Sequence, residues 1–317
     1  MTSAAPAPES LPAALPGERL SIAAPGGRIA CYFDAPSSPT DDTPLLLVHS
    51  INAAASAFEV KPLFEHYRAT RPVYAIDLPG YGASDRSARA YTPRLMTDAI
   101  LALIEVMVAR HPGRSIDAVA VSLSSEYLAR AVVEHPPSFR TVCLVSATGL
   151  NRIKRFDGPP GSTRGKPWLL KLLGRAPWSE ALFRLLTRRA VIRFFLEKTW
   201  GSKDIDLGLL EYDVLTTRVA GASNAPFHFL SAILFSADIT RVYESIAAPV
   251  LLVHGTKGDF TDYRGAPRLR DDFGWKIHVM PTGAMPYFED LPSFVAAFEE
   301  LVDTARSQPA PTARSGS

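Results

Sequence analysis

The feature that most constrains this chain is a regular alternation of short apolar runs with segments of helical periodicity. Six runs are apolar along most of their length, at residues 45–49, 73–77, 116–121, 142–146, 250–254 and 276–280. Between two of them, Ile100, Leu103, Ile104, Met107 and Val108 recur at the three- and four-residue spacing of a helix. Strands without polar alternation are typical of a sheet covered by helices on both faces. The pattern therefore predicts an α/β protein with a mostly parallel, doubly wound sheet.

The alternation stops between residues 150 and 245. This region contains helix-type segments without convincing strands, at residues 168–173, 178–186, 191–198, 207–219 and 226–235. A helical insertion between two strands of a parallel sheet predicts a cap over the carboxyl edge, where open α/β sheets bind ligands. We therefore expect a core of residues 18–149 and 246–305, and a helical cap of residues 150–245 inserted before the last two strands. Residues 19–24 and 28–33 flank a Pro-Gly-Gly turn and predict an antiparallel hairpin.

Composition at the ends and the cysteine content suggest where such a protein resides. Residues 1–17 and 306–317 are rich in Ala, Pro, Ser and Gly and are expected to be disordered tails. The N-terminus lacks the features of a secretory signal, and no apolar run reaches the ~18 residues of a membrane span. The two cysteines, Cys31 and Cys143, do not form a disulfide framework and have no metal-site pattern around them. We expect a cytoplasmic protein without metal or cofactor.

Charge is unevenly distributed along the chain. The overall net charge of +2 is too close to neutral to predict a nucleic-acid partner. Residues 152–198, however, hold twelve Lys and Arg against three acidic residues, a balance of +9. Aromatic residues are interleaved with them, namely Trp168, Trp178, Phe183, Phe194 and Phe195. Two interpretations stay open: a surface that contacts an anionic membrane or an acidic, lipid-like substrate, or an ordinary helix with its arginines in water.

A serine between a predicted strand and a predicted helix is the first candidate for chemistry. The strand at 116–121 leads directly into Ser122-Leu123-Ser124. A nucleophile elbow places its serine on a strained turn, so the residues two before and two after it must be small, as Ala120 and Ser124 are. The N-terminus of the following helix would stabilise an oxyanion. The pattern predicts unfavourable backbone angles at Ser122, and an ordinary N-capping serine is the alternative.

Two further loops follow predicted strands. The first strand ends in His49-Ser50-Ile51-Asn52, and the second in Asp77-Leu-Pro-Gly-Tyr-Gly-Ala-Ser-Asp-Arg86. Two glycines and a proline give the second loop a rigid turn. For Asn52 an ordinary strand-to-helix loop is the preferred interpretation.

Taken in order, these motifs resemble the α/β-hydrolase superfamily. The resemblance extends from about residue 18 to residue 305 and includes the run Val-His-Gly-Thr-Lys-Gly-Asp at 253–259. It implies a Ser…Asp…His triad in that chain order. By this resemblance Ser122 is the nucleophile, and the N–H groups of Ile51 and Leu123 form the oxyanion hole. Asp259 is the acid, shifted by one residue from the family's spacing, with Asp262 as the alternative.

The base of the triad is absent from its expected place. Residues 281–290 are similar to the family segment Gly-His-x-Pro-aromatic-x-Glu-Asp, but Ala284 occupies the histidine position. Alanine cannot accept a proton, and removing a triad member typically costs ~10⁴ to 10⁶ in kcat. His228 and His254 are the histidines that could replace the base. Tyr287 and Glu289 have weaker claims.

The resemblance implies a serine hydrolase of carboxylic esters or lipid-like substrates with an incomplete triad. Ser50, Asn52 and Met285 are the expected substrate contacts. The missing base leaves a second hypothesis open, a non-catalytic binding protein that keeps the hydrolase pocket. A deliberate substitution at position 284 that traps a complex is a third.

Overall fold

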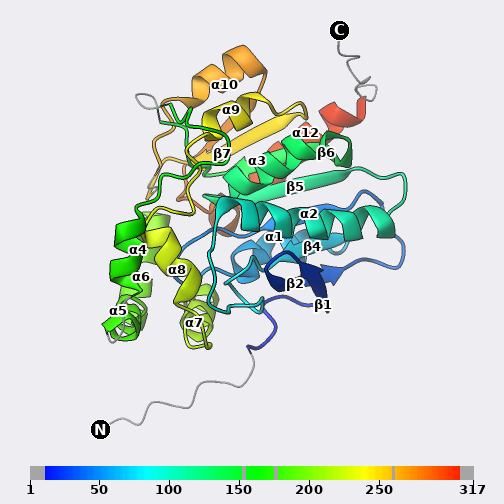
Figure 1. The fold of residues 1–317 in the computed structure, drawn as a ribbon. Helices are drawn as coiled ribbons and strands as arrows, with labels where there is room; N and C mark the ends of the chain where they lie inside the picture. The colour runs from blue at the N-terminus through cyan, green and yellow to red at the C-terminus, as the bar shows by residue number, and fades with distance from the viewer. Residues whose placement is uncertain (1–10, 152–154, 175–177, 259–260, 308–317) are drawn as a thin grey trace.

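The structure is a computed structural model that describes residues 11–151, 155–174, 178–258 and 261–307. Its centre is one eight-stranded sheet with helices on both faces (Figure 1). The strands are β1 (Glu18–Ala24), β2 (Gly27–Asp34), β3 (Leu45–Val48), β4 (Val73–Ile76), β5 (Ile116–Val121), β6 (Phe139–Val145), β7 (Val250–Gly255) and β8 (Lys276–Met280). Their order across the sheet is β1-β2-β4-β3-β5-β6-β7-β8.

Pairing within the sheet agrees with the prediction. The strands from β4 to β8 in this order pair in parallel, whereas β1 and β2 form an antiparallel hairpin that joins the sheet through β4. Each predicted strand lies within a few residues of an observed one. The mostly parallel, doubly wound α/β architecture and the N-terminal hairpin are therefore confirmed.

Alternate residues of the central strands face two separate cores. In β3, Leu46 and Val48 pack into the core on one face, and Leu45 and Leu47 pack into the core on the other. The first face is covered by α2 (Pro93–Arg110) and α3 (Ser124–Glu134), and the second by α1 (Lys61–Tyr67), α11 (Pro286–Glu289) and α12 (Leu291–Ser307). Helix α10 (Ala266–Phe273) connects β7 to β8. Burial on both faces explains why the strands show no polar alternation.

The helices between β6 and β7 form the inserted region. They are α4 (Pro167–Leu173), α5 (Trp178–Leu186), α6 (Arg189–Trp200), α7 (Leu207–Thr216), α8 (Asn224–Leu230) and α9 (Ile239–Glu244). Helices α4 to α8 gather at one side of the sheet, whereas α9 lies beside α3 (Figure 1). The five predicted helical segments are confirmed: 178–186 coincides with α5, and the boundaries of the others differ by at most five residues. None of the described helices is long and apolar enough to cross a lipid bilayer.

The N-terminal segment departs from its predicted disorder. Leu11, Ala14 and Leu15 are buried, and the N–H of Ala14 donates to the hydroxyl of Tyr32 in β2 at 3.2 Å. The hydroxyl of Tyr212 in α7 donates to the carbonyl of Pro12 at 2.9 Å. The expected tail is therefore wrong for residues 11–17, because their apolar side chains pack between β2 and α7. At the other end α12 includes residues 306 and 307; residues 1–10 and 308–317 of the predicted tails lie outside the described residues.

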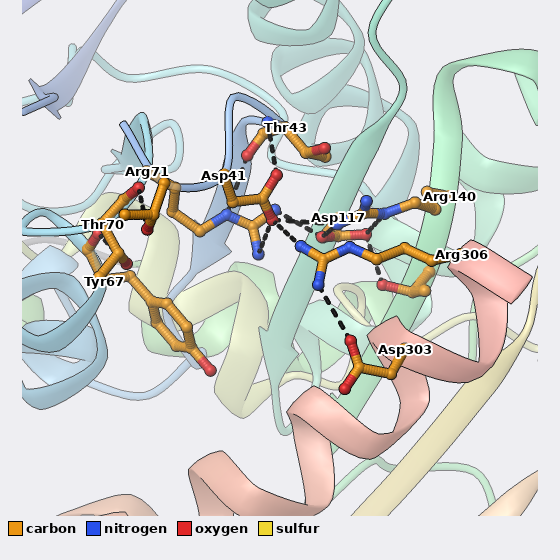
Figure 2. A network of polar contacts seen from close by, with 11 residues as sticks. Asp41, Thr43, Tyr67, Thr70, Arg71, Asp117, Arg140, Asp303 and Arg306 are labelled. Atoms are coloured by element: carbon orange, nitrogen blue, oxygen red, sulfur yellow. Dashed lines mark hydrogen bonds and ion pairs between the residues drawn. The ribbon is translucent and has the colours of Figure 1, made fainter. Parts of the chain in front are cut away.

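A buried ion network joins elements at the amino end of the parallel strands (Figure 2). The carboxylate of Asp117, near the start of β5, accepts hydrogen bonds from Nη2 of Arg71 at 2.5 Å and from Nε of Arg140 at 2.9 Å. Asp41 extends the network to Arg306 of α12, with 2.5 Å between Oδ2 and Nη2. Asp117 and Arg71 are almost fully buried, and two carboxylates, those of Asp117 and Asp41, join β5, β6, α12 and the segment that carries Arg71.

Candidate functional site

Ser122 forms a strained turn between β5 and α3, at the carboxyl edge of the sheet. Its φ is +55°, in the left-handed region that residues other than glycine rarely adopt. Its N–H donates to the carbonyl of Val145 in β6 at 2.7 Å, and its own carbonyl accepts the N–H of Ser125 at 3.1 Å. The turn is thus held from both sides, and the predicted unfavourable geometry is confirmed.

The small residues around Ser122 have the role that the sequence predicts. Ala120 and Ser124 are both fully buried. The hydroxyl of Ser124 is buried without a hydrogen-bond partner in the described part of the chain. A buried hydroxyl without a partner costs free energy, so the small volume of Ser124 explains its presence here better than its polarity does.

The strain at Ser122 leads to a stability prediction. Because glycine tolerates positive φ, we expect Ser122→Gly to be more stable than Ser122→Ala by about 1 kcal/mol. Ser122→Ala is the matched control, since it also removes the hydroxyl but keeps the Cβ. Urea unfolding of both variants measures the difference. Equal free energies of unfolding would show that the turn is not strained.

The two backbone N–H groups of the predicted oxyanion hole have no acceptor among the described residues. Within the described ranges, neither the N–H of Ile51 nor that of Leu123 donates to a protein atom. Leu123 has helical angles at the start of α3, so its N–H belongs to the unsatisfied first turn of that helix. Ser122 is half-buried, and its hydroxyl likewise has no partner among these residues. A free N–H on the residue after the serine is the kind of donor that an oxyanion hole uses, and the participation of Ile51 stays a prediction.

A buried carboxylate, Glu59, holds the loop that carries Ile51. It accepts the N–H of Ser50 at 2.7 Å, the hydroxyl of Ser50 at 3.0 Å and the amide of Asn52 at 2.7 Å. Burial raises the pKa of Glu59 to about 7, although these hydrogen bonds act in the opposite direction. Sequence reasoning missed Glu59, which has no local motif. The side chains of Ser50 and Asn52 contact Glu59, and their role in substrate binding stays a prediction.

Position 284 is connected to Ser122 through the end of β6. The carbonyl of Ala284 accepts the hydroxyl of Ser146 at 2.7 Å. Ser146 directly follows Val145, which binds the N–H of Ser122, and it also has a positive φ of 49°. The N–H of Ala284 donates to the carbonyl of Thr199 near the end of α6 at 2.8 Å. The loop after β8 is therefore linked to the elbow through Ser146 and Val145, and the assignment of Ala284 to the position of the base stays a prediction.

Comparison with known proteins decides the family. Residues 45–298 match the family model described as "Alpha/beta hydrolase family". The chain belongs to the alpha/beta hydrolase family. The pimeloyl-[acyl-carrier protein] methyl ester esterase of Neisseria meningitidis serogroup A is 26% identical over 275 residues, which cover 86% of this chain and 81% of that protein. The protein of the same name from a serogroup C strain is 26% identical over 269 residues, covering 84% and 96%.

Solved structures agree on the fold. A probable hydrolytic enzyme from Pseudomonas aeruginosa PAO1 superimposes with a TM-score of 0.67 at 18% identity, covering 93% of this chain and 96% of that chain. This likeness shows that the alpha/beta hydrolase fold is shared.

In this alpha/beta hydrolase no histidine is bonded to Ser122 within the described residues. Nδ1 of His228 lies 2.8 Å from the carbonyl of Asn224, and burial lowers the pKa of His228. Nδ1 of His254 lies 3.0 Å from the carbonyl of Gly255. Its ring stacks on Tyr263, with 3.9 Å between centroids. Both imidazoles have local partners in this arrangement, and a role as base stays a prediction for either.

The two weaker candidates also have partners elsewhere. The hydroxyl of Tyr287 donates to the carbonyl of Glu59 at 2.9 Å, and burial raises its pKa well above the usual value. Oε1 of Glu289 accepts the N–H of Gly283 at 2.6 Å. Neither residue forms a hydrogen bond with Ser122 in the part of the molecule that the structure describes.

The predicted acid and the remaining substrate contact are placed as follows. Asp259 lies outside the described residues. Asp262 forms an ion pair with Arg264, with distances of 2.8 and 2.9 Å. Met285 is buried in the core on the α12 face. Their catalytic and binding roles stay predictions.

Among the described residues, no group of three His, Cys, Asp or Glu side chains is arranged to hold a metal ion.

Proposed function

We propose that this protein is a serine hydrolase of carboxylic esters or lipid-like acyl compounds whose triad is incomplete. The observation that carries the proposal is the strained Ser122, whose hydroxyl has no partner among the described residues, together with the N–H groups of Ile51 and Leu123, which donate to none of these residues. The two relatives of about one quarter identity are ester hydrolases by name, which supports an ester as substrate.

In the proposed reaction Ser122 Oγ attacks the acyl carbon and the ester oxygen leaves with a proton. The N–H groups of Ile51 and Leu123 stabilise the negative oxygen of the tetrahedral intermediate. The serine proton passes to water, because Ala284 offers no imidazole to receive it. Both acylation and deacylation are therefore slow. Asp259, with Asp262 as the alternative, occupies the position of the triad acid.

Two further features belong to this proposal. Residues 150–245 act as a cap above the carboxyl edge, with α4 to α8 as its body. The location is cytoplasmic, in keeping with two cysteines that are free and buried.

A non-catalytic binding protein is the second candidate, and Ala284 is the observation that favours it. Without a base, a pocket that retains the oxyanion donors binds an acyl carbonyl without cleaving it. The two candidates differ in whether Ser122 forms a covalent bond.

Labelling with a fluorophosphonate probe distinguishes them. We expect Ser122 to react stoichiometrically but ~10⁴ to 10⁶ times more slowly than the serine of a complete triad. Intact-protein mass spectrometry over time measures the rate, and Ser122→Ala is the control that must stay unlabelled. Complete absence of adduct favours the binding protein. Rapid labelling at neutral pH would reveal a base that replaces the histidine, with His228 and His254 as the first residues to mutate.

A further inference from the structure

Large apolar side chains are exposed on three inserted helices. On α4 and α5 they include Trp168, which is 63% exposed, with Leu172 and Trp178. On α6 they are Phe194 and Phe195, each 52% exposed. We call these five residues the aromatic rim. Exposed apolar side chains on neighbouring helices usually mark an interaction surface, and α5 lies beside both α4 and α6.

Helical spacing explains why the rim faces outward. Trp168 and Leu172 are separated by one helical turn, on the side of α4 opposite Leu170 and Leu173, which pack on Phe183 and Phe227. The indole N–H of Trp178 donates to the carbonyl of Leu172 at 3.1 Å, so the exposed sides of α4 and α5 meet.

Helix α6 also has exposed apolar side chains on the face opposite its buried one. Ile192, Leu196 and Trp200 are buried at four-residue spacing. Phe194 lies on the opposite side of this helix, which therefore packs one apolar face on the core and exposes another.

Cations without acidic partners accompany the rim. Three arginines of this region are neutralised, since Arg184, Arg189 and Arg193 pair with Glu180, Glu211 and Glu197. Five other exposed cations form no ion pair within the described residues: Lys166, Lys171, Arg188, Lys198 and Lys203. Lys171 lies between Trp168 and Leu172 on α4, and Nζ of Lys198 is 5.9 Å from the ring centroid of Phe194. Positive charge and aromatic surface are thus interleaved.

We propose that the aromatic rim and its unpaired cations dock this protein on the surface of a membrane that contains anionic lipids. Each Lys or Arg near such a surface contributes attraction, and indole and phenyl rings favour the interface between headgroups and acyl chains. A folded acidic protein could also bind the cations of this surface. Separate aromatic side chains on three short helices suit a headgroup layer better, because lipids adapt to the shape of the protein. This docking does not depend on catalysis at Ser122.

Vesicle binding tests the proposal with the intact chain. We expect co-sedimentation with vesicles of phosphatidylcholine and phosphatidylglycerol at low salt, little binding to pure phosphatidylcholine, and release at high salt. Trp200 and Trp275 are buried, so Trp168 and Trp178 supply the solvent-exposed emission. Binding should shift that emission to shorter wavelength and expose it to quenching by brominated lipids.

Two double variants and one single control variant test whether the aromatic rim and its cations form the docking surface. Lys166→Gln with Lys171→Gln should weaken binding to anionic vesicles by about 10- to 30-fold, since each cation contributes about 1 kcal/mol. Phe194→Ala with Phe195→Ala should weaken it by about tenfold through lost insertion. Phe273→Ala on α10, which removes a similarly exposed ring, is the matched control and should bind like the wild type.

Several results would overturn the proposal. These are no binding to anionic vesicles at low salt, binding that the aromatic variant leaves unchanged, or a dimer in ultracentrifugation that this variant dissociates. Preferential binding of a small acidic protein over anionic vesicles would assign the surface to a protein partner. Ser122→Ala should bind vesicles normally, so failure of the proposed hydrolysis and failure of docking are separate outcomes.

Discussion

Ala284→His creates measurable hydrolysis of short p-nitrophenyl esters, with an expected rate gain on the order of 10². The loop after β8 is tied to the elbow through Ser146 and Val145, so the new imidazole starts in the neighbourhood of Ser122. A base able to accept the serine proton accelerates both acylation and deacylation. The gain stays far below that of a complete triad because an added base lacks the partners that orient it to within ~0.5 Å.

Two control variants make this result interpretable. Ala284→Gln adds a side chain of similar size without a strong base, and should stay inactive. Ala284→His combined with Ser122→Ala should lose the new activity. A folded Ala284→His protein that hydrolyses no ester would contradict the proposed relation between position 284 and Ser122, and would favour the binding protein.

Asp117→Asn should lower the free energy of unfolding by about 3 to 5 kcal/mol, the largest stability effect that we expect. Asp117 is fully buried between Arg71 and Arg140, and it also accepts the hydroxyl of Thr141 at 2.7 Å. The substitution leaves two guanidinium groups around a neutral amide. Asp42→Asn is the matched control, because Asp42 pairs with Arg114 where both side chains are 52% exposed. That pair should contribute less than about 1 kcal/mol.

The same network makes stability depend on pH. Burial alone would raise the pKa of Asp117, but the hydrogen bond and charge of Arg140 and the charge of Arg71 lower it below the usual value. A lowered pKa in the folded state means that the stabilisation is complete above the unfolded value of about 4 and is lost as pH falls through the folded value. Urea unfolding between pH 7 and the acid limit should show this loss in the wild type and its absence in Asp117→Asn. Parallel pH profiles would show that Asp117 does not contribute.

The sequence predicts the parts of this molecule that follow from local patterns. The strands are recognisable because burial on both faces makes each a short apolar run. The turn at Ser122 is recognisable because a positive φ between strand and helix demands small neighbours. In both cases the physical cause acts within a few residues of its effect.

Contacts between distant segments explain what sequence reasoning missed. Glu59 meets Ser50 because a loop and a short helix fold onto each other, and in sequence it is an ordinary acidic residue. Asp117 and Arg71 are 46 positions apart, so no periodic pattern relates them. Residues 11–17 have the composition of a tail, yet they pack because β2 and α7 together offer an apolar surface. Each of these features depends on the tertiary fold, which must exist before the contact does.

The packed N-terminal segment also limits how the inserted helices can move. Helix α7 is held by hydrogen bonds to the rest of the chain. Tyr212 is bonded to Pro12, and Nη1 of the buried Arg86 donates to the carbonyl of Thr216 at 2.8 Å. A swing of all inserted helices as one rigid lid would have to break both attachments. A displacement of α4 to α6 alone would leave both hydrogen bonds intact, so α7 is expected to stay in place when the other inserted helices move.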